Sequence, residues 1–321
     1  YNRGSEIRVP LRHLKATERC GIGVMASGLF AMDKSMMRAD DFVINTHNTA
    51  VEFDAAMGLG NFATDESLPI ELFVDGKVGV ADVALAYPVM SPIMKRVKNN
   101  SRIDVDVDID GTLARVNINE LKVELARHLL LDLNGSVAHV MSDENRSGHV
   151  ALSGNIVNAD MVESAMLDKE TRKLINIPPM TIDGEVTMLG EKINGELALL
   201  TDDGNVALDA DWNGRGNIYN MKLRADSFPV DAFLPDMGIG MLIADVAING
   251  RGFDYNNLNT LMKANVDLSH FEYKGHTYSN AHAWASLDSC HLVAGIESFN
   301  SSADFDLTAT SDIKNDAFEW N

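Results

Sequence analysis

The sequence predicts a mainly β protein: an elongated, curled and largely antiparallel sheet that forms an open β-trough, with one to three short helices. From Ile103 onward apolar and polar residues alternate, which is typical of strands with one buried and one solvated face. Few helical stretches separate these strands, which favours antiparallel meanders over β–α–β units. The composition, 45% hydrophobic and 23% charged, is that of an ordered protein.

The first 100 residues (1–100) are predicted to contain N-terminal strands and a short helix. Val43–Phe53 and Ile70–Val80 alternate as strands do, and Ser91–Lys98 is a candidate helix. The most apolar stretch, Gly21–Met32, is shorter than the roughly 18 residues that a transmembrane helix needs, and it contains several glycines. We therefore expect no transmembrane segment in this chain.

Residues 101–157 are predicted to form a strand meander. In its first strand, Ile103, Val105, Val107 and Ile109 alternate with four aspartates, so branched apolar groups and carboxylates lie on opposite faces. The same alternation returns at Leu121/Val123/Leu125, Leu129/Leu131/Leu133, Ile193/Leu197/Leu199, Val206/Leu208, Tyr219/Met221/Leu223 and Leu242/Ala244/Val246/Ile248. The chain is therefore predicted to be a long succession of half-buried strands.

Residues 158–176 are predicted to be a helical insertion. Asp160 and Glu163 have the spacing of a capping box ahead of an apolar run, so a helix is expected up to about Leu174, before Pro178–Pro179. A further short helix is predicted over Val230–Leu234. It lies within a second strand meander that covers residues 177–321.

A weak five-residue repeat with glycine at its centre runs through the strands. It occurs at Ile109–Leu113, Leu133–Val137, Leu152–Ile156, Ile182–Val186 and Ile193–Leu197. Asn-Gly and Asp-Gly are typical of two-residue hairpin turns, but such a turn would pair Leu133 with Ser136. The apolar residues are instead four apart, which favours a strand that continues through the glycine, although a three-residue loop preserves the same parity. A glycine on the apolar face leaves a shallow channel.

Strands that stay apolar on one face can curl into a trough or pair with a second sheet in a sandwich. Sandwich strands come with a compact repeat of turns and a closing topology, whereas here the pattern simply continues, so we favour the trough. The residues predicted to line its groove share the apolar parity of their strands: Val105, Val107, Val123, Leu131, Val186, Leu197, Leu199, Leu208, Met221, Leu223 and Val246.

Five segments, in their order along the chain, resemble the spaced pattern of the TamB-like proteins of the Gram-negative envelope, relatives of the AsmA-like group. They are Gly204–Asp209, Tyr219 with Leu223, Phe233–Pro235, Gly250–Asp254 and Phe271–Asn280. The resemblance covers roughly residues 100–315. It implies the open trough known as a β-taco, and residues 1–321 would then be one continuous segment of a longer protein.

The resemblance also implies a function in the periplasm. The role attributed to the family is to carry phospholipid from the inner membrane toward the outer membrane through a hydrophobic interior. The expected partners are phospholipid acyl chains, the inner membrane through an anchor outside this chain, and an outer-membrane β-barrel protein similar to BamA. The last partner follows from the family's association with the assembly of outer-membrane proteins.

Two patterns raise the question of a metal site. Asp106-x-Asp108-x-Asp110-Gly111 begins like a calcium loop, but position twelve is Asn117 instead of glutamate, and the intervening residues continue a strand. His270, His276 and His282 are six residues apart, but a turn through Lys274–Gly275 is expected to break their common face, and no recognisable ligand set is completed. A solvated strand face and surface histidines are favoured, and no metal or cofactor is predicted.

No motif for catalysis stands out. The chain has no G-x-S-x-G elbow, P-loop, dinucleotide fingerprint or H-E-x-x-H helix, so we expect a protein that is not an enzyme. Its two cysteines, Cys20 and Cys290, have neither disulfide-framework nor metal-ligand spacing. The net charge of −20 disfavours nucleic acid as a partner. Two other functions stay open: a secreted or surface β-sandwich that binds glycan or protein, and a carbohydrate-active enzyme on a β-helix.

Overall fold

The computed structural model consists almost entirely of strands that follow one another along the chain. It describes residues 6–19, 21–61, 65–87, 100–139, 142, 144–159, 163, 171–300, 303–314 and 317–320. It divides into two units, Tyr1–Arg172 (unit 1) and Lys173–Asn321 (unit 2). The boundary between them lies within residues 158–176, the stretch predicted to be a helical insertion.

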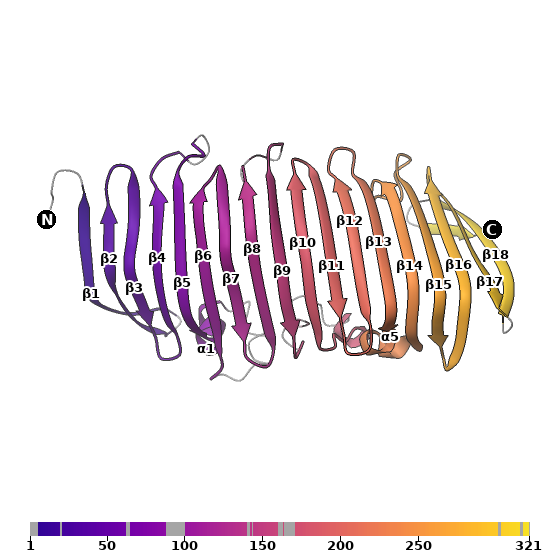
Figure 1. Ribbon diagram of the computed structural model, residues 1–321, viewed down its shortest axis with the longest axis horizontal. Helices are drawn as coiled ribbons and strands as arrows, with labels where there is room; N and C mark the ends of the chain where they lie inside the picture. The colour runs from indigo at the N-terminus through magenta and orange to yellow at the C-terminus, as the bar shows by residue number, and fades with distance from the viewer. Residues whose placement is uncertain are drawn as a thin grey trace. The chain divides into compact units, whose positions relative to one another are not determined.

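Unit 1 is an antiparallel sheet in which each strand pairs with the next one (Figure 1). Its strands are β1 (Ile7–Thr17), β2 (Gly23–Met32), β3 (Met36–Asn45), β4 (Ala50–Gly58), β5 (Pro69–Gly79), β6 (Arg102–Thr112), β7 (Arg115–Leu125), β8 (Leu129–Ala138) and β9 (Ser147–Ile156). Helix α1 (Val80–Ala86) follows β5 directly. Among the described residues no pairing joins β1 to β9, so this sheet is open.

Unit 2 repeats this plan, again with pairing between consecutive strands. Its strands are β10 (Met180–Leu189), β11 (Lys192–Leu200), β12 (Asn205–Asn213), β13 (Ile218–Pro229), β14 (Ile239–Arg251), β15 (Leu261–Tyr273), β16 (His276–Asp288), β17 (His291–Asn300), β18 (Ala303–Lys314) and β19 (Ala317–Trp320). Helix α4 (Thr171–Leu174) precedes β10, and α5 (Val230–Phe233) and the 3-10 helix η2 (Pro235–Met237) lie between β13 and β14. The fold class predicted from the alternation, a largely antiparallel and open β-sheet, is confirmed.

Local irregularities curl the strands. The pairing register shifts at several places in both units, for example between Ala39 and Phe42 of β3 and between Ala225 and Phe228 of β13. Asp41 and Ser227 lie within these shifts and have positive φ angles of 51° each. An extra residue in one strand of a pair bends that strand and increases its twist. The sheets are therefore curled instead of flat.

The central glycine of each repeat lies inside a strand, although Leu113, the last residue of Ile109–Leu113, lies in the β6–β7 hairpin turn. Gly135 is inside β8, where it pairs with Ile118 and Val150, and Gly184 is inside β10, opposite Leu197. A Cβ atom at Gly184 would lie 2.9 Å from the carbonyl oxygen of Glu196. The strand thus passes straight through the glycine on its apolar face, as the parity of the flanking residues predicted.

One strand prediction for the first 100 residues was wrong, and the other, Ile70–Val80, is confirmed as β5 (Pro69–Gly79) except for its last residue. Val43–Phe53 is not one strand, because Thr46–Thr49 form the connection between β3 and β4. Val80 does not end a strand but begins α1, where its side chain is fully buried. The helix predicted over Val230–Leu234 is confirmed as α5. Ser91–Lys98 and most of the helix predicted after Asp160 lie outside the described residues.

A small buried core lies beside α1, and other buried residues lie within strands, among them Ala31 of β2 and Ala225 of β13. In unit 1, Val80 of α1 packs with Leu125, and Val83, Ala84 and Ile103 surround them.

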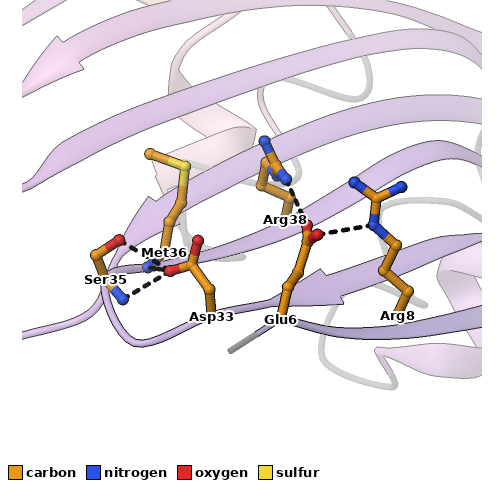
Figure 2. A network of polar contacts seen from close by, with 6 residues as sticks. All are labelled: Glu6, Arg8, Asp33, Ser35, Met36 and Arg38. Carbon is orange, nitrogen blue, oxygen red and sulfur yellow. Dashed lines mark hydrogen bonds and ion pairs between the residues drawn. The ribbon is translucent and has the colours of Figure 1, made fainter. Parts of the chain in front are cut away.

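The edge strand β1 is almost wholly exposed, and a polar network connects its start to β3. The Glu6 carboxylate accepts hydrogen bonds from Arg8 and Arg38, both at 2.9 Å, as Figure 2 shows. The same view shows Asp33 closing the turn between β2 and β3 by accepting hydrogen bonds from Ser35 and Met36.

Candidate functional site

The predicted groove residues of unit 2 form a continuous ladder across neighbouring strands. Leu197, Leu208, Leu223 and Val246 are direct cross-strand partners in β11, β12, β13 and β14. The same row continues through Val266, Ala283, Ile296 and Leu307 of β15 to β18. Every position in this row is apolar, so the sheet carries an uninterrupted apolar line perpendicular to its strands.

The remaining predicted residues of unit 2 lie in the two adjacent rows of the same face. Leu199 of β11 pairs with Val206, whose other neighbour is Ala225. Val186 of β10 belongs to the row on the other side, which passes through Gly195 and Ala210 to Met221 and Ile248. Together these rows form what we call the apolar face of unit 2.

Unit 1 has an equivalent apolar face. Val105, Val123 and Leu131 are cross-strand partners in β6, β7 and β8. Val107 lies in the next row, opposite Leu121 of β7 and Val74 of β5. The structure thus brings the predicted residues together in two groups, one in each unit.

The apolar face of unit 2 is more sheltered than the polar face, although it is not fully buried. Leu197, Leu208 and Leu223 are half-buried, whereas the longer side chains of Glu196 and Lys222 on the other face are exposed. The leucines of neighbouring strands shield one another within the apolar rows. Toward the outer strands the face is more open, since Val186 is 40% exposed and Leu307 is 61% exposed.

The accessible surface shows how little of the sheets is covered. The chain exposes 19620 Å². A compact protein of this mass would expose about 13,000 Å², and two separate compact halves about 15,800 Å². Each unit is a single meandering sheet and not a pair of stacked sheets, so the sandwich proposed as an alternative does not describe this fold.

Aromatic rings mark the end of the unit 2 apolar face beside α5. The ring of Phe233 stacks on that of Phe228, with 4.7 Å between the centroids. Nearby, Phe271 and Tyr278 of β15 and β16 stack at 4.9 Å. These four residues are not among those predicted to line the groove. Register shifts in β13, β14 and β15 break the simple alternation here, so only the pairing itself reveals their common face.

A second aromatic pair lies at the opposite ends of these strands. Tyr219 of β13 has its ring stacked on Phe253, in the β14–β15 connection, with centroids 4.9 Å apart. Burial raises the pKa of the Tyr219 hydroxyl. Phe253 itself is 67% exposed and covers Tyr219 from the solvent side. The β14–β15 connection therefore folds over one end of the apolar face.

Helix α1 is attached to unit 1 by a buried carboxylate. Asp82 accepts hydrogen bonds from the Thr46 hydroxyl at 2.5 Å, the Thr49 hydroxyl at 2.7 Å and the Asn48 side-chain amide at 3.1 Å. Burial by itself raises the pKa of Asp82, but these hydrogen bonds outweigh it, and the net pKa is lowered. The carboxylate is used entirely in holding α1 to the β3–β4 turn, which argues for a structural role.

Several of the residues considered as metal ligands, such as Asp110 and His282, have other partners. Asp106, Asp108 and Asp110 lie in β6 and not in a loop, and Asn117 and Asn119 donate hydrogen bonds to Asp110. His282 contacts Asp267 through Nδ1 at 2.7 Å. Among the described residues, no group of three or more histidine, cysteine, aspartate or glutamate side chains is arranged to hold a metal ion. Cys290 is a free thiol, and Cys20 lies outside the described residues.

The comparisons with known proteins leave the site to be interpreted from its own residues. No protein-family model, curated protein or solved structure matches this chain. None of the described helices has the length and apolar character to cross a membrane.

Proposed function

We propose that this chain is a non-catalytic, lipid-handling segment of a periplasmic protein, and that its apolar faces line a groove for phospholipid acyl chains. The observation that supports the proposal best is the unbroken apolar ladder from Leu197 in β11 to Leu307 in β18. A conduit needs a continuous dry surface, whereas an enzyme needs a pocket with a few converging polar groups.

The energetics of acyl-chain burial suit such a surface. An acyl chain of about 16 carbons costs on the order of 13 kcal/mol to expose to water, at roughly 0.8 kcal/mol per CH₂ group. The apolar side chains of this row, half-buried from Leu197 to Ile296 and exposed at Leu307, offset this cost by replacing water along the acyl chain. Since no charged residue interrupts this ladder, an acyl chain can shift along it without crossing a polar barrier.

The resemblance to TamB-like proteins supports placing this segment between the two membranes of a Gram-negative envelope. In that setting the full protein is anchored at the inner membrane and carries phospholipid toward the outer membrane. A contribution to outer-membrane biogenesis, through an outer-membrane β-barrel protein similar to BamA, belongs to the same proposal.

The test compares two neighbouring residues of β11 that face opposite ways. Leu197→Asp places a carboxylate in the apolar ladder, and Glu196→Lys changes a charge on the polar face. We expect Leu197→Asp to lower the phospholipid recovered in an organic extract of the purified protein about tenfold, because a carboxylate in an apolar path costs at least 1.4 kcal/mol. Its melting temperature falls by only a few degrees, since an unoccupied groove lets the carboxylate reach water.

Glu196→Lys is the matched control and retains lipid at the wild-type level. It also relieves the repulsion from Glu185 and Asp209, which lie directly opposite Glu196 on either side. Mass spectrometry of the organic extracts measures the phospholipid retained by each variant. Equal lipid in both variants, or complete unfolding of Leu197→Asp, would contradict the groove. Binding of a glycan or protein by a lipid-free wild-type chain would instead favour a surface-binding function.

A further inference from the structure

Exposed apolar side chains gather at one rim of the unit 2 sheet. This rim is formed by the strand ends at the β10–β11, β12–β13 and β14–β15 connections (Figure 1). We call its exposed apolar residues the apolar rim: Leu189, Trp212, Ile218, Phe253, Tyr255, Leu258 and Leu261. Leu189 and Leu258 are each 69% exposed. Soluble proteins rarely expose so many large apolar groups together unless the surface contacts a partner.

Part of the apolar rim lies on the polar face of the sheet. Leu189 pairs with Lys192 at the end of β10. Ile218 and Leu261 pair with Arg251 from either side. These three apolar residues occupy the outermost row of that face, whereas the next row is polar in every strand from β10 to β15. The alternation that keeps this face polar therefore stops at the rim.

The rest of the apolar rim continues into the apolar face. Trp212 pairs directly with Tyr219, and both lie in the row of that face nearest the rim. The ring of Phe253 stacks on Tyr219 from the β14–β15 connection, which also carries Tyr255 and Leu258. Apolar side chains thus surround the strand ends on both faces and over the connection. A partner that docked on one face alone would leave many of them in water.

The two rims of unit 2 also differ in charge. The three connections of the apolar rim contain two carboxylates: Glu191 contacts Arg215 at 3.8 Å, and Asp254 accepts a hydrogen bond from the backbone N–H of Asn256 at 3.0 Å. The opposite rim, at the β11–β12 connection, the end of β13, α5 and η2, carries five aspartates: Asp202, Asp203, Asp226, Asp231 and Asp236. In a chain with a net charge of −20, an anionic surface is therefore repelled less by the apolar rim than by the opposite one.

These properties fit the interfacial layer of a phospholipid bilayer. Tryptophan and tyrosine have an apolar body and a polar tip, and they concentrate at the level of lipid headgroups, where one end is dry and the other is wet. Leucine and phenylalanine strengthen such binding by burying apolar area in the same layer. A bilayer surface encloses what enters it, so it contacts both faces of the rim and the connection at once.

We propose that the apolar rim of unit 2 inserts into the interfacial layer of a phospholipid bilayer. This inference rests on the proposed lipid-handling function and adds the surface at which acyl chains enter or leave the groove. Because Trp212 and Tyr219 belong to the apolar face, an acyl chain that leaves the bilayer at this rim reaches the apolar ladder without crossing a polar row. The aspartates of the opposite rim then lie on the side away from the membrane.

The test is flotation of the whole chain with vesicles of phosphatidylethanolamine and phosphatidylglycerol. Phe253→Ser, Leu258→Ser removes two highly exposed side chains of the apolar rim, and Leu200→Ser, Met237→Ser removes two exposed apolar side chains at the opposite rim as the matched control. We expect the wild type and the control to bind alike and the rim variant to bind about tenfold more weakly. Should the loss of the Phe253 ring prevent folding, Leu189→Ser, Leu258→Ser provides the same test.

Tryptophan fluorescence locates the contact. Trp212 lies at the apolar rim, whereas Trp284 lies in the middle of β16. Vesicles that contain brominated phospholipid should quench the emission of the bound wild type, because bromine quenches a ring only at close range. Trp212→Phe should reduce this quenching, and Trp284→Phe should not. Quenching that is independent of Trp212 would mean that another surface enters the bilayer.

The outcomes separate this inference from the proposed function. A wild type that yields phospholipid in its organic extract but does not bind vesicles overturns only the rim inference, as does equal vesicle binding by the wild type and the rim variant. Vesicle binding through the rim by a wild type that yields no phospholipid contradicts the proposed function and leaves the rim as a membrane contact. A dimeric wild type and a monomeric rim variant, neither of which binds vesicles, would assign the rim to an interface between copies of the chain and overturn the inference.

Discussion

Helices α1 of unit 1 and α5 of unit 2 occupy the same place in their sheets but are held there by different chemistry. Both follow a strand directly, and both begin with a buried valine, Val80 at 0% and Val230 at 8% exposure. Beyond that residue they differ. Asp82 of α1 binds the β3–β4 turn through hydroxyl and amide groups, whereas Phe233 of α5 stacks on Phe228 of the preceding strand. The topology fixes the position of each helix and leaves the chemistry of its attachment free.

The largest effect is expected from the removal of the α1 carboxylate. Asp82→Ala eliminates three charge-assisted hydrogen bonds and leaves the donors of Thr46, Asn48 and Thr49 without their acceptor. We expect the free energy of opening of α1 to fall by about 3 kcal/mol, measured by native-state hydrogen exchange. Asp231→Ala, in the first turn of α5, is the control, because Asp231 is exposed and should contribute less than about 0.5 kcal/mol. Similar losses in both variants would mean that α1 is not held by its carboxylate.

A smaller effect is expected from the aromatic anchor of α5. Phe233→Ala removes the stack on Phe228 from a half-buried position, and we expect the opening of α5 to become easier by about 2 kcal/mol. Phe233→Leu preserves most of the apolar area without the stacking and should recover more than half of that loss. Hydrogen exchange of the backbone amides of Val230 to Leu234 measures the free energy of opening of α5 in both variants. If leucine behaved like alanine, the ring geometry and not the buried area would hold the helix.

Acid should distinguish the two helices. The pKa of Asp82 is lowered in the folded protein, so its contribution to stability is present above its unfolded value of 3.8 and is lost as the pH falls through the lower folded value. Protonation weakens its hydrogen bonds without removing the side chain, so the effect is smaller than that of Asp82→Ala. Between about pH 5 and about pH 3, protection of α1 should decrease before that of α5. Simultaneous loss of both would contradict the comparison.

The smallest effect concerns the segment that precedes β10. The Asn176 side-chain amide donates to the carbonyl oxygen of Ala232 at 2.7 Å, and its backbone N–H donates to that of Phe233 at 2.8 Å. Asn176→Ala removes only the first of these bonds from an exposed residue, so α5 should lose about 0.5–1 kcal/mol. Asn176→Gln, with its longer side chain, tests whether the geometry matters. A loss as large as that of Phe233→Ala would make this segment the main anchor of α5.

The difference between the two helices also marks where sequence reasoning works. The helix at Val230 could be predicted because Pro229 and Pro235 bracket it and stop the alternation of β13. The helix at Val80 could not, since Val74, Val78 and Val80 continue the period of a strand. What ends that strand is the contact of Asp82 with a turn more than 30 residues earlier, and no local pattern contains that information.

The apolar faces were predictable because they depend on a period of two, which the chain maintains wherever the strands are regular. The row from Leu197 to Val246 follows directly from it. The aromatic residues Phe271 and Tyr278 were missed, because extra residues near Ser269 and Asn280 shift the parity within β15 and β16.

Pairing between consecutive strands also has a consequence for how the chain folds. Within each unit every strand has its hydrogen-bonding partner in the segment just before it, so each new pairing closes only a short loop and the entropy of closure stays small. Contacts of such low sequence separation favour rapid folding. A sheet of this kind can grow strand by strand as the chain becomes available, much as repeat proteins propagate from one end. Neither unit has to wait for its last strand before its first ones become ordered.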